Sequence, residues 1–317
     1  MSKNNIIGFV LIALVLIGFS WYSQPSEEER REAFVRDSIQ QVAREQYEAK
    51  AKESARQKAI AAKQVALADT NALFHSALQG KAHRVVLKNG KVELTLNSKG
   101  AFVEKAVIKG YTGHDINQKD GSKDTPDLTL FDQKDNTLKF LLATKEANIN
   151  TADLYFQPTQ VTDTTVTFTA EASPGKYLTL KYWLGKDYLL HMSLSTQGMA
   201  GLFAPTYDKM DVQWTGKARQ QERGFTFESS YATLTYHDVE GGTDNLSETS
   251  EEIDEPLEET IDWVAFKNQF FSAVMIAKDN FQEGALMTSI PQQKGSGYLK
   301  NYEAKMKTAF DPTGQKP

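Results

Sequence analysis

The chain has 317 residues, of which 40% are hydrophobic and 24% are charged, and its formal net charge is -5. A mean hydropathy of -0.48 is typical of a mostly water-soluble chain, and the acidic balance disfavours binding to nucleic acid. The sequence has no cysteine, which excludes disulfides, thiol catalysis and cysteine-based metal sites.

The N-terminus carries an uncharged apolar run over residues 6–22. A helix over this run would span roughly 25 Å, which is short for a hydrocarbon core of about 30 Å, but its uncharged polar flanks can lie among lipid headgroups. Trp21 and Tyr22 stand where an interfacial aromatic belt would lie, and the run lacks a good cleavage site. We therefore expect residues 1–25 to be a retained membrane anchor that contacts the lipid bilayer through residues 6–22, with a cleaved signal peptide as the alternative.

The charges around this anchor leave its orientation open. Arg30, Arg31 and Arg36 follow the run, whereas only Lys3 and the terminal amine precede it, and the positive-inside rule read literally would place the body in the cytoplasm. A long hydrophilic tail after a near-terminal span is commonly exported whatever the local charge. We expect a cytoplasmic N-terminus and a body on the far side of the membrane.

The next segment, residues 26–82, is rich in Ala, Glu, Lys, Arg and Gln, as helices are. A coiled coil would need apolar residues on one seam, but the phase set by its first valine and isoleucine puts Gln46 and Glu53 there. The pattern favours a solvated helical spacer over a partner-binding helix. It also weakens an alternative function, that of a single-span coiled-coil scaffold.

From about residue 83 the hydrophobic period changes from 3.6 to 2, which is typical of strands. Asn89-Gly90 lies between two alternating runs and predicts a hairpin, and Val92, Leu94 and Leu96 share one face of the second run. Similar alternating runs, separated by turn residues, follow along the chain. The pattern predicts one all-β sandwich domain over residues 83–317.

An acidic stretch over residues 240–260 interrupts the strands. Its carboxylates could attract Ca²⁺, but the spacing of an EF-hand loop is absent. Composition predicts a solvated mobile loop, and we assign it no chemistry.

The familiar catalytic motifs are absent: there is no phosphate-binding loop, nucleophile elbow or zinc-binding histidine pair. The five histidines are scattered, and one among strand residues, such as His191, is most often structural. We therefore predict no enzyme activity, no catalytic residue, no cofactor and no metal site. Sugar stacking on aromatic side chains stays open as an alternative. The candidates for it are Trp183, Trp214, Tyr231 and Trp263.

One later stretch, residues 261–277, reads IDWVAFKNQFFSAVMIA, two apolar runs of which the second predicts a strand buried on both faces. Its Trp263, Lys267, Phe270 and Phe271 match a W-x-x-x-K-x-x-F-F pattern. With a preceding strand region, GFTFESSYATLTY, and with the opening residues, this pattern resembles the bacterial membrane protein insertase YidC, in the form found in Bacteroidetes. We take the four motif residues as structural.

The resemblance covers essentially the whole chain. It implies a β-super-sandwich of the galactose-mutarotase type and an inner-membrane protein with a periplasmic domain. It also implies a non-enzymatic role in inserting and folding membrane proteins, with nascent membrane proteins and the Sec translocon as partners. Members of the family continue into several further spans, and this chain has no second apolar run of about 18 residues. We expect it to be the N-terminal part, truncated before the insertase core. The fold also leaves an alternative: a membrane-anchored, sugar-binding or sugar-active domain.

Overall fold

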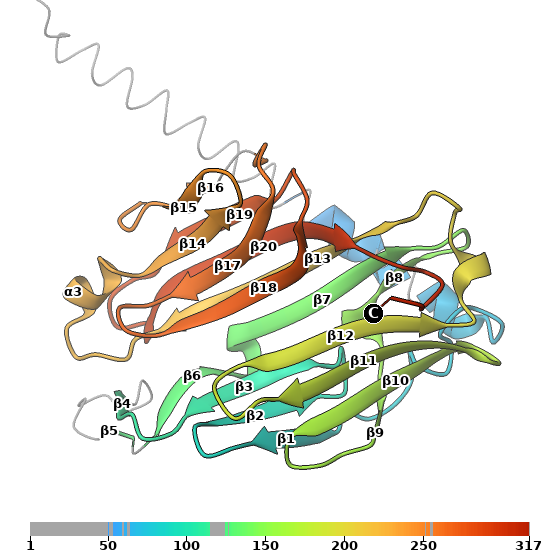
Figure 1. The fold of residues 1–317 in the computed structure, drawn as a ribbon, viewed down its shortest axis with the longest axis horizontal. Helices are drawn as coiled ribbons and strands as arrows, with labels where there is room; N and C mark the ends of the chain where they lie inside the picture. Colours follow the sequence, from blue (N-terminus) through green and yellow to red (C-terminus); the bar gives the residue numbers. More distant parts are fainter. Residues whose placement is uncertain are drawn as a thin grey trace, which may run out of the picture. The chain divides into compact units, whose positions relative to one another are not determined.

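In the computed structural model, strands build almost all of the unit from Ala66 to Pro317 (Figure 1). The structure describes Lys50 and the residue ranges 53–58, 60–61, 64–114, 124–125, 127–250, 252–253 and 256–316. The all-β architecture confirms the fold class that the alternating patterns predict.

The N-terminal sheet has four strands in the order β1-β2-β3-β6, each antiparallel to its neighbours. The expected hairpin is present, since β1 pairs with β2 on either side of Asn89-Gly90. The Asn89 carboxamide oxygen stabilises its turn by accepting hydrogen bonds from the backbone N–H groups of Lys91 and Val92. One face of β2 is buried and the other is half-buried, as its alternating sequence predicts. The strands are β1 (Arg84–Lys88), β2 (Val92–Asn97), β3 (Phe102–Ile108) and β6 (Leu128–Asp132).

A second four-stranded sheet has the order β12-β11-β10-β9, which makes it a meander of neighbouring chain segments. Its buried face includes Phe168 and Tyr182, whose rings pack edge to face with centroids 6.2 Å apart. The buried Tyr182 hydroxyl donates to the Ala101 carbonyl oxygen at 2.6 Å, so it ties this sheet to the turn between β2 and β3. The strands are β9 (Gln157–Thr159), β10 (Thr165–Ser173), β11 (Lys176–Leu184) and β12 (Leu190–Gln197).

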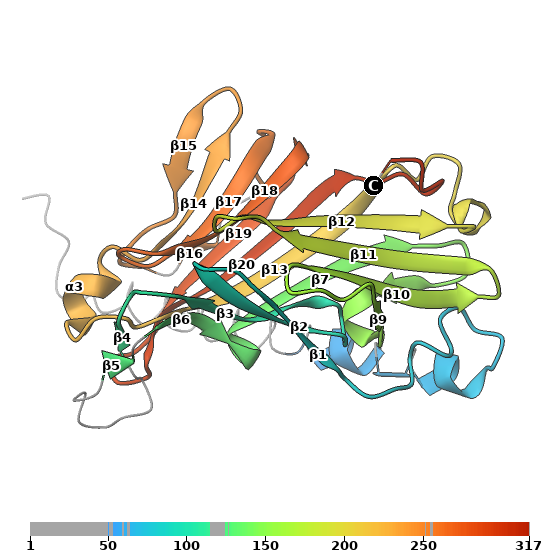
Figure 2. The same ribbon diagram turned by 60° about the horizontal axis from the view of Figure 1, so that its bottom comes forward.

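The third sheet is the largest, with ten strands and the main order β15-β14-β17-β18-β20-β13-β7-β8. Strand β19 also pairs with β20, and β16 pairs with β19. Figure 2 shows β14, β17 and β18 rising together at one end of this sheet. The strands are β7 (Asn136–Ala143), β8 (Asn148–Asn150), β13 (Lys209–Arg219), β14 (Thr233–Asp238), β15 (Gly242–Asn245), β16 (Glu252–Ile253), β17 (Ile261–Lys267), β18 (Ser272–Phe281), β19 (Leu286–Pro291) and β20 (Tyr298–Ala309).

Side chains from all three sheets share one continuous hydrophobic core. Within the largest sheet, Phe266 of β17 stacks on Trp214 of β13, with ring centroids 3.7 Å apart. Gly216 of β13 makes room for this contact, because a Cβ there would lie 2.5 Å from the Phe266 ring. The Trp214 indole N–H donates to the Asn136 carboxamide oxygen at 2.8 Å, so its polar atom is satisfied inside the core.

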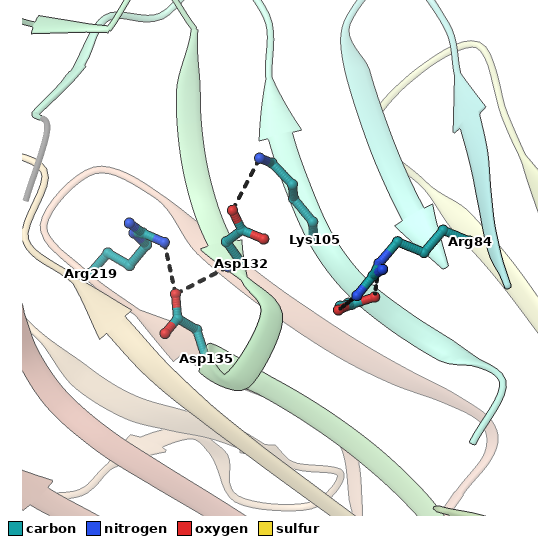
Figure 3. A network of polar contacts seen from close by, with 6 residues as sticks. Arg84, Lys105, Asp132, Asp135 and Arg219 are labelled. Atoms are coloured by element: carbon teal, nitrogen blue, oxygen red, sulfur yellow. Dashed lines mark hydrogen bonds and ion pairs between the residues drawn. The ribbon is translucent and has the colours of Figure 1, made fainter. Parts of the chain in front are cut away.

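A polar network connects the N-terminal sheet with the largest sheet (Figure 3). Asp135, in the short 3-10 helix η1 (Gln133–Asp135), accepts from the Arg219 guanidinium at 2.8 Å and from the Tyr298 hydroxyl at 2.8 Å. The same carboxylate accepts the backbone N–H of Asp132, while Asp132 pairs with Lys105 at 3.1 Å. Asp135 is buried, so the network replaces water as its partner.

The residues that precede β1 differ from the expected helical spacer over residues 26–82. The described residues up to Ala68 are helical, but residues 69–82 form turns and coil. Leu73, Phe74 and Ala77 are buried in the core, and the expected boundary at residue 83 therefore lies inside the compact unit. Tertiary packing overrides the helical composition here.

The membrane anchor expected over residues 1–25, with Trp21 and Tyr22, lies outside the described residues. Within the part of the chain that the structure describes, no helix is both long and apolar enough to cross a bilayer.

Two local expectations are wrong. The acidic stretch over residues 240–260 is not a plain loop, since β15 pairs with β14 and β16 pairs with β19. The segment expected to be a strand from Gly224 begins as a helical turn, α3 (Phe225–Ser229), because the Glu228 N–H bonds to the Gly224 carbonyl oxygen. Two further short strands, β4 (Gly113–His114) and β5 (Asp124–Thr125), pair with each other. Two 3-10 turns, η2 (Thr151–Asp153) and η3 (Ala200–Leu202), complete the described elements.

Candidate binding site

An aromatic hollow of about 570 Å³ lies beside the loop that joins β17 to β18. Four segments far apart in the chain line it, and we call it the aromatic hollow throughout. In Figures 1 and 2, β4 and α3, which follow two of these segments, lie at the same end of the unit, together with β5. Its walls are Ile108, Tyr111, Tyr188, Glu222, Phe270 and Phe271, and Thr112 and Ser272 complete the lining.

The β17–β18 hairpin places the two phenylalanines in the hollow. Lys267 ends β17 and pairs with Ser272, so residues 268–271 form the turn. The buried Asn268 carboxamide oxygen accepts hydrogen bonds from the N–H groups of Phe270 at 3.2 Å and Phe271 at 2.8 Å. Asparagine suits this position because its short side chain can bond to the backbone two or three residues ahead.

The aromatic rings of the hollow contact each other but leave much of their surface to solvent. Phe271 packs edge to face against Tyr111, with centroids 5.3 Å apart, while Phe270 is 66% exposed. Tyr111 and Tyr188 are also exposed, and partial burial together with the neighbouring Tyr111 raises the pKa of Tyr188. Lys91 lies over the Tyr188 ring at 5.2 Å from its centroid. Clustered exposed aromatic rings are a feature of binding surfaces.

The loop before α3 supplies the acid of the hollow, Glu222, and Glu228 supports that loop. The Glu228 carboxylate accepts the Gln221 N–H at 2.9 Å and the Glu222 N–H at 3.0 Å. Burial raises the pKa of Glu228 to about 7, although these hydrogen bonds work in the opposite direction. The loop that carries Glu222 is therefore fixed by hydrogen bonds from its backbone to the buried Glu228 carboxylate.

The structure separates the four motif residues into two groups. Phe270 and Phe271 line the hollow, whereas Trp263 lies farther back on β17 and stacks on His237, with centroids 5.8 Å apart. Lys267 lies between them, and its carbonyl oxygen accepts from the Tyr302 hydroxyl at 2.9 Å. Our expectation of a structural motif remains a proposal.

Sequence reasoning missed Tyr111, Tyr188 and Glu222 as members of this site. Each follows a different element, and only the folded chain brings them to the hairpin. The local signal is weak, since a tyrosine beside turn residues such as Gly110 or Asp187 is common on any surface.

The expected strand after the phenylalanines is wrong in one respect, because β18 is not buried on both faces. Its outward residues Val274 and Ile276 are 50% and 62% exposed. The inward residues Ala273 and Met275 are only half-buried. The apolar run therefore belongs to a strand that packs one face against the core and exposes the other. An unbroken apolar run does not by itself show that both faces are buried.

The other aromatic candidates do not line the aromatic hollow. Trp214 is buried, Trp183 stacks on His191 at 4.5 Å between centroids, and Tyr231 packs against Phe227. In the part of the chain that the structure describes, no group of three or more His, Asp or Glu side chains could hold a metal ion.

The fold and the site together define an all-β domain with an exposed aromatic hollow. The family described as YidC periplasmic domain matches residues 84–316. The chain belongs to this family, as the motif residues and the opening stretch suggest.

Two curated relatives carry the same family name. The membrane protein insertase YidC of Phocaeicola vulgatus is 42% identical over 319 residues, which cover 100% of this chain and 49% of that protein. The protein of the same name in Bacteroides fragilis is 38% identical over 320 residues, covering 100% of this chain and 50% of that protein. The chain thus spans about half the length of the curated relatives it matches.

Among solved structures, a galactose mutarotase-like protein from Lactobacillus casei resembles this fold, with a TM-score of 0.44 and 12% identity. The likeness covers 74% of this chain and 97% of that protein. At this identity it concerns the fold and transfers no activity.

Proposed function

We propose that this chain is the N-terminal anchor and periplasmic domain of a membrane protein insertase, which assists the insertion and folding of integral membrane proteins. The full-length coverage of the chain by relatives named as insertases carries this proposal. The exposed aromatic hollow supports a role through binding rather than through bond-making chemistry.

The proposal includes a topology and partners. Residues 6–22 would hold the chain in the inner membrane with its N-terminus in the cytoplasm, and residues 84–316 would lie in the periplasm, as the family description says of its members. Nascent membrane proteins are the expected partners, with or without the Sec translocon.

Depletion of the complete gene product in its host tests this function. Newly made inner-membrane proteins should then stay accessible to extraction by alkali, because their spans fail to enter the bilayer. A plasmid copy of the gene should restore insertion, and export of a soluble periplasmic protein that has no membrane span serves as the control. Normal insertion after full depletion would contradict the proposal.

The sugar alternative has one observation in its favour, the pair of His237 with Asp262 at 2.9 Å beside Trp263. The Trp263 ring is stacked on the His237 ring, which covers part of the surface that a sugar would need. Polarimetry of galactose solutions with the whole chain in detergent should therefore give the uncatalysed rate of mutarotation. A faster rate that Asp262→Asn abolishes would favour the sugar reading instead.

A further inference from the structure

Strand β18 has an open edge. On one side it pairs with β17 from Trp263 opposite Ile276 to Lys267 opposite Ser272, and, after a register shift, at Ile261 opposite Phe281. On the other side it pairs with β20 only at Phe281, opposite Thr308, among the described residues. An unpaired edge presents backbone N–H and C=O groups that can pair with another extended chain.

The composition of this edge differs from that of three strands at the ends of their sheets, β8, β9 and β15. Residues 272–277 read SAVMIA, with no charge and no proline. In contrast, β9 and β8 have three residues each, β9 contains Pro158, and β15 contains Asp244. Short strands, prolines and charges are the usual protections of an edge, and β18 has none of them before Lys278.

The side chains of β18 also remain open to an added strand. On its inner face, Ala273 and Met275 are half-buried, although the opposite residues on β17, Phe266 and Val264, are buried. On its outer face, Val274 and Ile276 are half-exposed or more. A neighbouring strand would cover both faces of this edge.

The open edge leads directly into the aromatic hollow. Ser272, the first residue of β18, lines the hollow together with Phe270 and Phe271. Six residues of an extended chain cover roughly 20 Å, so a strand along residues 272–277 would reach the hollow with its next side chain. The volume of about 570 Å³ is within the range of pockets that hold small ligands or large side chains.

We propose that the edge of β18 from Ser272 to Ala277 binds an extended, uncharged segment of a client polypeptide, which adds a strand to the sheet and places an aromatic or large aliphatic side chain in the hollow. Backbone hydrogen bonds supply affinity in this mode of recognition, and the end pocket supplies selectivity. The identity of the occupant as a client rests on the proposed function, but the edge and the hollow do not.

A second copy of this chain fits the edge less well. Two copies that pair edge to edge about a two-fold axis run antiparallel. The partner would then bring its Lys278 and Asp279, at the far end of β18, towards the aromatic hollow instead of an apolar side chain. The uncharged edge and the aromatic walls match an uncharged segment better.

Fluorescence anisotropy tests the proposal with the whole chain in detergent. The probe is a fluorescein-labelled octapeptide of alternating valine and threonine that ends in phenylalanine. A control peptide has proline at alternate positions, which removes the backbone N–H donors at those positions. We expect saturable binding of the first peptide, and at least tenfold weaker binding of the proline peptide.

The matched variants are Val274→Lys on the edge and Val161→Lys on the turn between β9 and β10, which belongs neither to the edge nor to the lining of the hollow. The two valines are 50% and 52% exposed. Val274→Lys should weaken binding at least tenfold and Val161→Lys should leave it unchanged. Ile276→Lys, at a residue 62% exposed, repeats the edge test should Val274→Lys fail to fold by circular dichroism. Phe270→Ala should remove the preference for a terminal phenylalanine over a terminal alanine.

Equal binding by Val274→Lys or Ile276→Lys and wild type, or equal binding of the two peptides, would overturn the proposal. A dimer in sedimentation that Val274→Lys abolishes, without peptide binding by wild type, would also overturn it and assign the edge to a second copy. The insertion assay uses no β18 variant, so its outcome does not depend on this binding experiment. Failure of the proposed function and failure of this proposal can therefore be distinguished.

Discussion

Glu228 is the residue whose environment departs most clearly from that of an exposed acid. It is buried, it supports the loop that carries Glu222, and burial raises its pKa to about 7 from 4.5. The folded protein therefore holds this proton more tightly than the unfolded chain does. The contribution of Glu228 to the free energy of unfolding is fully present below about pH 4.5 and is lost as the pH rises through 7.

We predict that Glu228→Gln removes this pH dependence. The glutamine oxygen can still accept a backbone N–H, but it does not titrate. In wild type, Glu228 should lower the free energy of unfolding between pH 5 and 7 by at most about 1.4 kcal/mol per pH unit. Urea unfolding at pH 5 and pH 7 measures the slope, and an unchanged slope in the variant would contradict the assignment.

Residue types alone did not locate the site. The sequence motif includes Phe270 and Phe271, and both line the hollow. Trp263 of the same motif lies elsewhere on β17, where it stacks on His237. The motif runs from β17 into the turn before β18, so its two ends lie in different surroundings.

At the scale of elements, the network around Asp135 joins η1 to β13 and β20. Its carboxylate has the Arg219 guanidinium, the Tyr298 hydroxyl and the Asp132 N–H as partners, and both members of its ion pair are largely buried. The nearby pair of Lys105 with Asp132 is more exposed. Removing one partner of a buried ion pair lowers the free energy of unfolding more than removing one partner of an exposed pair does.

We predict that Asp135→Ala lowers the free energy of unfolding by about 3–5 kcal/mol, since it leaves the Arg219 charge buried without its partner. Lys105→Ala is the matched control in the same network, and it should cost less than about 1 kcal/mol. Chemical unfolding of both variants measures the difference. Similar losses for the two would show that burial does not set the strength of this network.

Local sequence patterns predict where strands lie better than they predict which strand faces are buried. Alternation and turn residues locate the β1–β2 hairpin and the meander from β10 to β12, because both signals are local. They fail at β18, where an apolar run lies at an open edge, and at residues 69–82, where Leu73 and Phe74 pack into the core. In both cases the outcome depends on distant partners that no local window contains.

At the scale of the whole molecule, three sheets form one core, and loops from separate sheets meet at the aromatic hollow. Composition and period predict the sandwich, because they depend on the number and spacing of strands. They cannot predict that Tyr111, Tyr188 and Glu222 converge, because this depends on how the sheets pack. The same packing leaves the edge of β18 open beside the hollow.

Photo-crosslinking in living cells with the complete gene product tests whether this domain binds clients along the open edge of β18. A benzoylphenylalanine in place of Ile276, on the open edge, is compared with one in place of Val161, on the turn between β9 and β10. We predict that the edge position captures newly made membrane proteins during their synthesis and that the turn position does not. Equal capture at both positions, or none at the edge while the protein still supports insertion, would contradict the claim that this domain acts by binding clients.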